Sequence, residues 1–592
     1  MARRRGAAMR LRLALRRVRR NDRAVLSALA VAVGAGAAGG AILFREAIGW
    51  IQWLGYGFSS ERVHSLAAAL PWWQLLLVPT LGGLLIGLFV RFVMPQGRNQ
   101  GVADVAEAMA FQGGRMSARA GIGAALSGAA SIGVGASVGR EGPVVHLGAS
   151  LAAWVAAKLN LTPSLTRTLL GCGVASAVAA SFNAPIAGVF FALEVVIGHY
   201  ALGAFAPIVI ASVTGTILSR GHFGDFPAFI VPGREIVSFL EFPAYALLGV
   251  VCAVAAILFM RSIFLAEDVA KRMPVPAWSR PAFAGLAIGA IALAFPEVLG
   301  VGYEATDAAL KELFPLWMLL LLIVIKTAAT AICLGSGFGG GVFSPSLFVG
   351  AMVGGAFGIV AASAFPGYAS GHGAYAMIGM GAVAGAVLGA PISTILIIFE
   401  ITGDYQMTIA VMVAVVIASL LTQQFAGRSF FALQLARRGI DLKGGREVGL
   451  LRGIRVRQVM RRAFASVSLG ADAAEIRGAL QAAPQGMLFV LDEDGRLHGV
   501  ITLADLGAAA FDPTLDPLVR AADAARPPRD LLTPADDLET ALKALETTDE
   551  GRLPVVRDLD DPEPLGFVTE QDAQAAYTRA LLRLRAEERG ED

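Results

Sequence analysis

Apolar segments separated by short breaks rich in glycine and proline dominate residues 24–430. Several are shorter than the ~20 residues that one helix needs to cross the hydrocarbon core of a bilayer. Broken helices are typical of transporters, because irregular backbone at membrane depth is tolerated only where it is buried or lines a cavity. The pattern predicts an all-α polytopic membrane domain over 24–430, with apolar stretches at roughly 71–94, 121–137, 144–157, 168–200, 202–219, 241–264, 281–298, 314–334, 342–363, 375–400 and 407–425.

The first apolar run, from Ala24 to Phe44, follows an arginine-rich segment at 1–23. This run is longer than the apolar core of a signal peptide. We interpret it as a membrane helix whose basic N-terminus stays in the cytoplasm, as the positive-inside rule predicts. Basic clusters also bind nucleic acid, but we expect no nucleic-acid partner here.

Beyond a linker at 431–453, the pattern changes to short β-like runs and polar helices. Met487–Val490 and Gly499–Thr502 flank a polar turn, which predicts a β-hairpin. Leu553–Val556 and Gly566–Thr569 repeat this layout. We therefore expect an α/β tail of two similar units, 454–510 and 519–580, followed by a charged end at 581–592.

Charge separates the same two parts. Residues 1–440 carry 30 basic and 18 acidic side chains, whereas residues 441–592 carry 19 and 28. The three cysteines and six histidines are scattered, and no H-E-x-x-H motif occurs. These features predict a membrane part and a soluble part, with no metal site and no catalytic residues, so we do not expect an enzyme.

The membrane part contains an internal repeat of roughly 200 residues. Gly139-Arg140-Glu141-Gly142-Pro143, followed by Gly148, aligns with Gly341-Val342-Phe343-Ser344-Pro345, followed by Gly350, at an offset of 202. Ala184-Pro185-Ile186 with Glu194 aligns with Ala390-Pro391-Ile392 with Glu400 at an offset of 206. Paired interrupted segments in two halves point to the binding site of a transporter.

Each repeat places a glycine-rich loop before an apolar helix: Val138–Pro143 before Val144–Ala157, and Gly335–Pro345 before Ser346–Phe357. Helix N-termini attract anions, so two such loops could form an anion site. The alternative is that the glycines serve only close helix packing. The acidic residue of the first loop, Glu141, could occupy the anion position when ionised and leave it when protonated; alternatively, it pairs with Arg140.

The loops G-R-E-G-P at 139–143 and S-G-F-G-G-G-V-F-S-P at 336–345, with F-E-I-T-G-D-Y at 399–405, resemble the signature loops of the CLC chloride channels and proton/chloride antiporters. The resemblance implies inverted repeats and a homodimer in a lipid bilayer, with a separate pore for chloride or another small anion in each subunit. It also implies a role for each matching residue: Glu141 as the gate, the amides of Val342 and Phe343 and the hydroxyl of Tyr405 as anion ligands, and Arg140, Gly142, Gln100 and Gly101 at the anion path.

Two departures from the family pattern affect selectivity and coupling. Gln100 replaces a serine whose hydroxyl contacts the anion, which leaves nitrate or another small anion open. Val195 stands where antiporters carry an internal proton-transfer glutamate, so the sequence favours a gated channel over the alternative of a proton-coupled antiporter. The preceding residue, Glu194, is duplicated as Glu400, which predicts a structural hydrogen-bonding role.

The tail resembles a tandem pair of CBS domains. Each unit ends in a Gly-apolar-apolar-Thr-x-x-Asp motif. The resemblance implies that Thr502, Asp505, Thr569 and Asp572 could contact the ribose of an adenine nucleotide, the only cofactor we consider. The alternative is a folded pair that stabilises the dimer.

Two other classes of function remain as competitors: a membrane-embedded enzyme with a regulatory tail, and a CBS-regulated cation transporter. The first lacks a clustered nucleophile and base. The second would need acidic side chains or converging carbonyl groups in its pore. The excess of arginine over lysine suggests a GC-rich bacterial genome, and we expect a multi-pass protein of the bacterial inner membrane. The positive-inside rule and the regulatory tail predict that both termini are cytoplasmic.

Overall fold

The computed structural model describes residues 22–198, 202–225, 236, 238–366, 369–440, 451, 453–483, 486–548 and 551–589. The chain divides into two compact units, Met1–Leu442 and Lys443–Asp592. The arginine run at 3–20, residues 441–450 and 452 of the predicted linker, and the last three residues lie outside the described residues. Both parts of the predicted fold, helical membrane domain and α/β tail, are confirmed.

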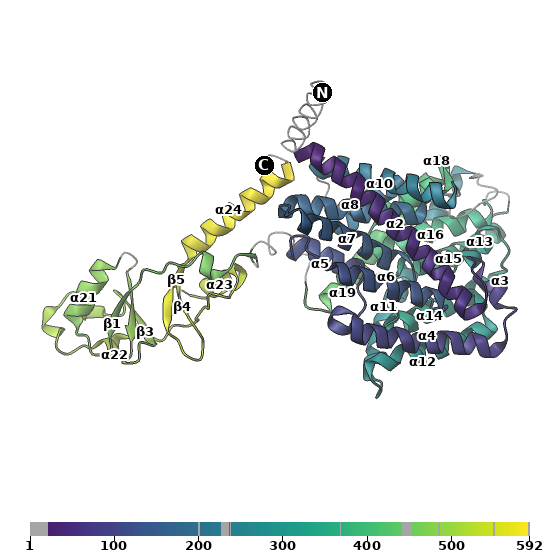
Figure 1. Cartoon of the computed structure of the whole chain (residues 1–592). Helices are drawn as coiled ribbons and strands as arrows, with labels where there is room; N and C mark the ends of the chain where they lie inside the picture. The colour runs from purple at the N-terminus through teal and green to yellow at the C-terminus, as the bar shows by residue number, and fades with distance from the viewer. Residues whose placement is uncertain are drawn as a thin grey trace, which may run out of the picture. The chain divides into compact units, whose positions relative to one another are not determined.

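The first half of unit 1 is helical and begins with a long helix that runs diagonally across the bundle in Figure 1. Its elements are α2 (Asp22–Tyr56), α3 (Val63–Ala67), α4 (Trp72–Val93), η1 (Pro95–Gly97), α5 (Val102–Phe111), α6 (Ala118–Gly133), α7 (Glu141–Lys158), α8 (Pro163–Phe182), α9 (Pro185–Phe191), the π-helix η2 (Ala192–Ile197) and α10 (Leu202–Phe223).

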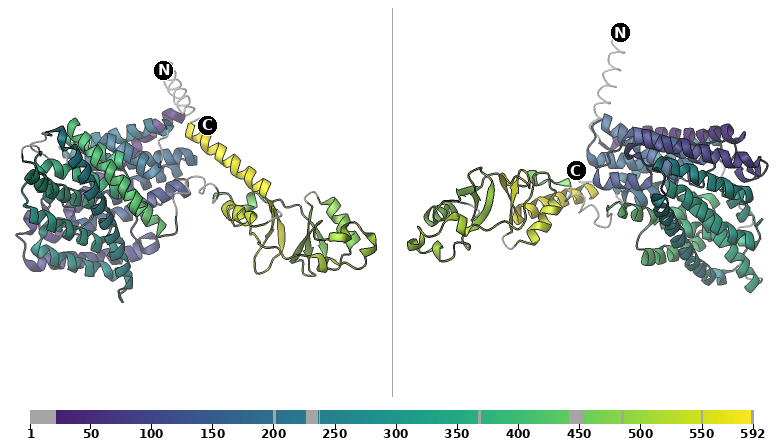
Figure 2. Two further views of the ribbon diagram at one scale, coloured as in Figure 1. Left: turned by 180° about the vertical axis from the view of Figure 1, so that it is seen from behind. Right: turned by 90° about the horizontal axis from the view of Figure 1, so that it is seen from below.

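The second half contains the remaining helices of unit 1, and the view from behind in Figure 2 shows its C-terminal, green part on the face opposite α2. Its elements are η3 (Phe239–Glu241), α11 (Phe242–Arg272), η4 (Ala277–Ser279), α12 (Arg280–Ala294), η5 (Pro296–Val298), α13 (Tyr303–Leu310), α14 (Leu316–Ser336), α15 (Phe343–Ala364), α16 (His372–Leu388), α17 (Pro391–Thr402), α18 (Tyr405–Ala426) and α19 (Phe430–Ala436).

Within the described residues, nine helices are long and apolar enough to cross a membrane. Two predicted boundaries differ from the structure. The helix expected at 24–44 continues to Tyr56, and the stretch at 168–200 divides into α8 and α9. The division has a local cause, because Asn183 ends α8 in the left-handed conformation (φ 58°) and Pro185 starts α9.

The two halves meet where α4 crosses α12. A Cβ atom on Gly83 would overlap the Pro281 carbonyl oxygen, and one on Gly285 would overlap the Pro79 carbonyl oxygen. These residues are related by the repeat offset of 202, so the contact is reciprocal. Small residues allow helix backbones to approach closely inside a membrane.

Each half also contains an equivalent close contact between two of its own helices. A Cβ on Gly148 of α7 would overlap the Gly173 carbonyl of α8, and one on Gly350 of α15 would overlap the Gly379 carbonyl of α16. The expected close-packing role is therefore real for these glycines. The loop glycines have a different role, described below.

Unit 2 contains two small sheets. In the first, β1 (Ala465–Ser468) lies parallel to β2 (Met487–Leu491), which pairs antiparallel with β3 (Leu497–Thr502). In the second, β4 (Arg552–Val556) pairs antiparallel with β5 (Pro564–Thr569). Both predicted hairpins are confirmed. Helices complete the unit: α21 (Ala473–Ala482), α22 (Ala521–Ala524), α23 (Leu538–Glu546) and α24 (Glu570–Arg589), with short 3-10 turns at Val456–Gln458, Gly507–Ala510 and Pro513–Leu515.

Candidate anion site

The two glycine-rich loops lie against each other through a pair of equivalent residues. Gly139 and Gly341 exchange both backbone hydrogen bonds, each with an N···O distance of 2.8 Å. A Cβ on Gly341 would lie 2.9 Å from the Gly142 nitrogen, and one on Gly142 would lie 3.2 Å from the Gly341 Cα. Only glycine permits this approach, so the loop glycines bring two helix N-termini together.

Both helices start earlier than the sequence predicts. The sequence predicts Val144 and Ser346 as the first helical residues, but α7 starts at Glu141 and α15 at Phe343. Proline is compatible with a first helical turn, because the N–H that it lacks has no partner inside the helix there. As a consequence, Glu141 belongs to the first turn of α7.

The Glu141 carboxylate lies at the N-terminus of the other repeat's helix. It is 4% exposed, and its Oε1 accepts a hydrogen bond from the Ser344 hydroxyl in the first turn of α15. Its Oε2 has no hydrogen-bond partner among the described residues. The positive end of a helix dipole and its unpaired N–H groups favour an anion at this place. The carboxylate therefore occupies a position suited to an anion.

A pocket of about 530 Å³, which we call pocket A, reaches both N-termini. It is lined by six of the residues predicted at the anion path, namely Gln100, Gly101, Glu141, Gly142, Val342 and Phe343. Its charged lining comprises six basic and three acidic residues: Arg91, Arg98, Lys271, Arg280, Arg437 and Arg438, with Asp104, Glu141 and Glu267. A basic lining raises the local concentration of anions.

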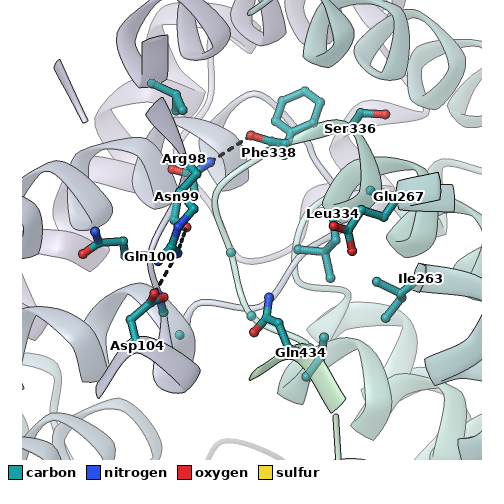
Figure 3. Close-up of a pocket in the computed structure, with 18 of the residues that line it drawn as sticks. Arg98, Asn99, Gln100, Asp104, Ile263, Glu267, Leu334, Ser336, Phe338 and Gln434 are labelled. Atoms are coloured by element: carbon teal, nitrogen blue, oxygen red, sulfur yellow. Dashed lines mark hydrogen bonds and ion pairs between the residues drawn. The ribbon is translucent and has the colours of Figure 1, made fainter. Parts of the chain in front are cut away.

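The segment at Gln100 differs from a simple anion ligand. The Gly101 N–H already donates to Asp104 Oδ2 at 2.8 Å, and Asp104 also pairs with Arg98 at 2.7 Å. Asn99 donates to the Gly337 carbonyl at 2.8 Å. In Figure 3 the Gln100 amide points away from Gln434, which lies across the pocket. This N-terminus, of α5, is thus capped by the chain's own carboxylate.

Arg140 faces a different pocket. It lines pocket B, which has a volume of about 240 Å³, and it is 7% exposed. Its guanidinium donates to the Ser181 carbonyl at 2.7 Å and to Glu61 Oε1 at 3.4 Å. The alternative of an Arg140–Glu141 pair is not observed among the described ion pairs. Arg140, the residue before α7, thus lines pocket B, whereas Glu141, the first residue of α7, lines pocket A.

Tyr405 is not brought to the site. Its side chain is 73% exposed at the start of α18, and it lines neither pocket. The aromatic residues of α19 that line pocket A are Phe430 and Phe431, which carry no hydroxyl group. The expected inner hydroxyl ligand therefore does not lie at Tyr405. Val195 also lines neither pocket and packs against the main apolar core.

Sequence reasoning missed Ser344 and Tyr303. The Tyr303 ring centroid lies 4.8 Å from the Arg140 guanidinium carbon, and its hydroxyl oxygen lies 3.5 Å from Ser344 Oγ. The sequence could have indicated Ser344 as a site residue, because it directly follows the predicted anion ligand Phe343 in the second glycine-rich loop. Tyr303 lies in no motif of the sequence, so nothing in the sequence indicated it as a site residue.

The threonine and aspartate of each tail motif bond to one another. Thr502 Oγ1 donates to Asp505 at 2.8 Å, and Thr569 Oγ1 donates to Asp572 at 2.7 Å. Arg461 also donates to both oxygens of Asp572, at 2.6 and 2.9 Å. The hydrogen bonds from Arg461 are the main cause that holds the pKa of the Asp572 carboxyl below its usual range, and the hydrogen bond from Thr569 lowers it further.

Residues 82–423 match the family described as voltage gated chloride channel, which is more than half of the chain. The chain belongs to this CLC family. Residues 456–510 and 522–578 match the CBS domain.

Relatives of this CLC chain carry names of two kinds. It is 35% identical over 418 residues to a protein named putative chloride channel protein ClcB-like of Ralstonia nicotianae, covering 70% of this chain and 97% of that one. It is 29% identical over 410 residues to one named H(+)/Cl(-) exchange transporter ClcA of Yersinia pseudotuberculosis, covering 67% and 84%.

The CLC fold is also shared with solved structures. A slow cyanobacterial Cl-/H+ antiporter matches with a TM-score of 0.63 at 22% identity, over 70% of this chain and 97% of that one. The chain is therefore a multi-pass membrane protein with the CLC fold and belongs to a family of anion transporters.

Proposed function

We propose that this CLC protein is a proton-coupled antiporter of chloride or a similar small anion. The observation that carries the proposal is the Glu141 carboxylate at the N-terminus of α15, in a position suited to an anion. The sequence favoured a gated channel. The relatives named exchange transporters support the alternative instead.

Competition between a carboxylate and an anion for one place gives coupling. An anion that enters through pocket A meets the N-terminal N–H groups of α7 and α15. Glu141 blocks this place while it is ionised. Protonation removes its negative charge, so the neutral side chain gives way to the anion, and the next exchange requires the proton to leave.

The apolar Val195 does not oppose this mechanism. The channel interpretation requires that protons cannot reach Glu141 without an internal carboxylate at this position. Pocket A extends from Arg437 and Arg438, directly after α19, to Glu141 itself, and a pocket of about 530 Å³ has room for several water molecules. We propose that water in pocket A carries protons to Glu141.

The six basic residues of pocket A support a cytoplasmic opening for it, by the positive-inside rule. A homodimer in the bacterial inner membrane, with both termini cytoplasmic, is part of the same proposal. For the tail we keep an adenine nucleotide as a prediction. A nucleotide at Asp572 would have to displace or accommodate Arg461.

The test is simultaneous measurement of chloride efflux and external pH with purified protein in liposomes. We expect chloride to leave while protons move in the opposite direction at a fixed ratio. Chloride flux without proton movement would restore the channel interpretation. No anion flux would reject both.

A further inference from the structure

Pocket B contains a buried cation with incomplete compensation. The Arg140 side chain is 9% exposed, and its Nε has no hydrogen-bond partner among the described residues. Its carboxylate neighbour, Glu61, has a side chain that is 54% exposed and contacts Arg140 through a single oxygen at 3.4 Å. A buried guanidinium is normally held by a bidentate carboxylate or by full hydrogen bonding.

The same Glu61 oxygen is shared with a second arginine. Arg45 Nη2 lies 2.9 Å from Glu61 Oε1, and the Arg45 guanidinium stacks on Phe223 at 4.0 Å from the ring centroid. Two guanidinium groups from α2 and from the Gly139–Gly142 loop thus converge on one oxygen atom. This is the arrangement of a site for a single small anion, with the Glu61 oxygen in the anion's place.

The other acidic residues of pocket B are engaged elsewhere or make no described contact with these arginines. Glu304 accepts hydrogen bonds from the backbone of His64 and Ser65 at the start of α3, at 2.9 and 3.2 Å. Glu46 pairs with His222 at 3.2 Å. Glu297 lines the pocket with one buried oxygen that has no described partner, and no ion pair joins it to Arg45 or Arg140.

We infer that Arg45 and Arg140 form a second anion site in pocket B, where a small monovalent anion exchanges with the Glu61 carboxylate. Pocket B, at about 240 Å³, has room for such an anion with water. Because Arg140 precedes Glu141, the site lies one residue from the carboxylate that closes the path. It holds an anion next to the gate, and this role rests on the proposed anion transport.

Binding is tested apart from transport. Crystals of the full-length protein grown in bromide are compared for wild type, Glu61→Gln and Glu297→Gln by anomalous scattering. We expect a bromide peak between the two guanidinium groups that is strongest in Glu61→Gln. No peak there in Glu61→Gln overturns the inference, and so does an equal increase in Glu297→Gln, which would indicate a general effect of charge. This result does not depend on whether the protein couples anions to protons.

Transport supplies a second measurement in liposomes. Glu61→Gln should lower the chloride concentration for half-maximal exchange about threefold, the size expected for removing a partly exposed competing charge, with little change in maximal rate. Adding Arg45→Gln should reverse the shift. An unchanged half-saturation in Glu61→Gln, or no reversal by Arg45→Gln, contradicts the site.

Discussion

Glu194 and Glu400 exchange helix caps between the two repeats. Glu194, in the π-helix η2 that continues α9, caps the N-terminus of α17, and Glu400, near the C-terminal end of α17, caps the N-terminus of α9. Glu194 accepts from the backbone N–H groups of Ile392 (3.1 Å) and Ser393 (2.8 Å) at the start of α17, and Glu400 accepts from those of Ile186 (2.8 Å) and Ala187 (2.7 Å) at the start of α9. The predicted structural hydrogen-bonding role is confirmed. This exchange joins the two repeats, since each supplies the charge that the other's helix N-terminus needs.

The reciprocal caps predict a symmetric loss of stability. Glu194→Ala and Glu400→Ala should each lower the free energy of unfolding by about 1–3 kcal/mol, because two backbone donors of a helix lose a charged acceptor. Glutamine at either position should recover part of the loss. Denaturant titration in mixed micelles measures both, with Glu267→Ala on α11 as a control. A large loss at one position alone would contradict the reciprocity.

Glu141→Gln should uncouple chloride flux from proton movement. The neutral amide cannot ionise, so we expect chloride flux to persist while coupled proton movement falls to background and flux loses its dependence on pH. Parallel chloride and pH electrodes record both. Glu267→Gln, which lines the same pocket but pairs with Lys271, is the matched control and should remain coupled. Wild-type coupling in Glu141→Gln would remove this residue from the mechanism.

Ser344→Ala should weaken the hold on the Glu141 carboxylate without removing its charge. Since the hydroxyl donates to this carboxylate, its loss should increase chloride turnover at neutral pH severalfold while proton coupling remains. Ser346→Ala is the control, because that hydroxyl bonds to the Phe343 carbonyl of its own helix. Equal turnover in wild type and Ser344→Ala would contradict the proposed restraint.

The crossing of α4 and α12 predicts severe steric effects. Gly83→Ala and Gly285→Ala each place a methyl group against a carbonyl oxygen of the other repeat and should destabilise the fold by about 1–3 kcal/mol or prevent folding. Gly39→Ala in α2 has open space and should be neutral or slightly stabilising. The yield of monodisperse protein and the apparent melting temperature report the difference. Equal behaviour of all three variants would contradict the contact.

The Arg461–Asp572 pair predicts a pH-dependent effect in the tail. Because the pKa of Asp572 is depressed in the folded state, its contribution is fully present above the unfolded carboxyl pKa of about 3.9 and declines as the pH falls through the lower folded value. Arg461→Gln should therefore reduce the amide protection of β5 at pH 7, and the difference from wild type should shrink in acid. Arg557→Gln, at an exposed pair, should change little. A difference that grows in acid would have the wrong sign.

Most of the fold followed from local patterns. Apolar run length and motifs repeated at an offset of 202 are encoded in short segments, and they predicted the helices and the duplication. The division of 168–200 at Asn183 and Pro185 was not predicted, although Pro185 marks the start of α9. The same offset also relates Pro79 and Gly83 to Pro281 and Gly285, so the sequence carries a further sign of the duplication. Helix starts were less accurate, because proline is compatible with a first turn as well as with a loop.

The sequence by itself determined the membrane class, the duplication, the paired anion-attracting N-termini and the acidic residue between them, since hydropathy, glycine spacing and charge are encoded locally. Only the tertiary structure decided which partners these residues have. In the structure the Ser344 hydroxyl donates to Glu141, Arg140 contacts Glu61, and Tyr405 is exposed. The physical reason is that contacts between residues many positions apart depend on how helices cross, and crossing geometry is set by packing of the whole bundle.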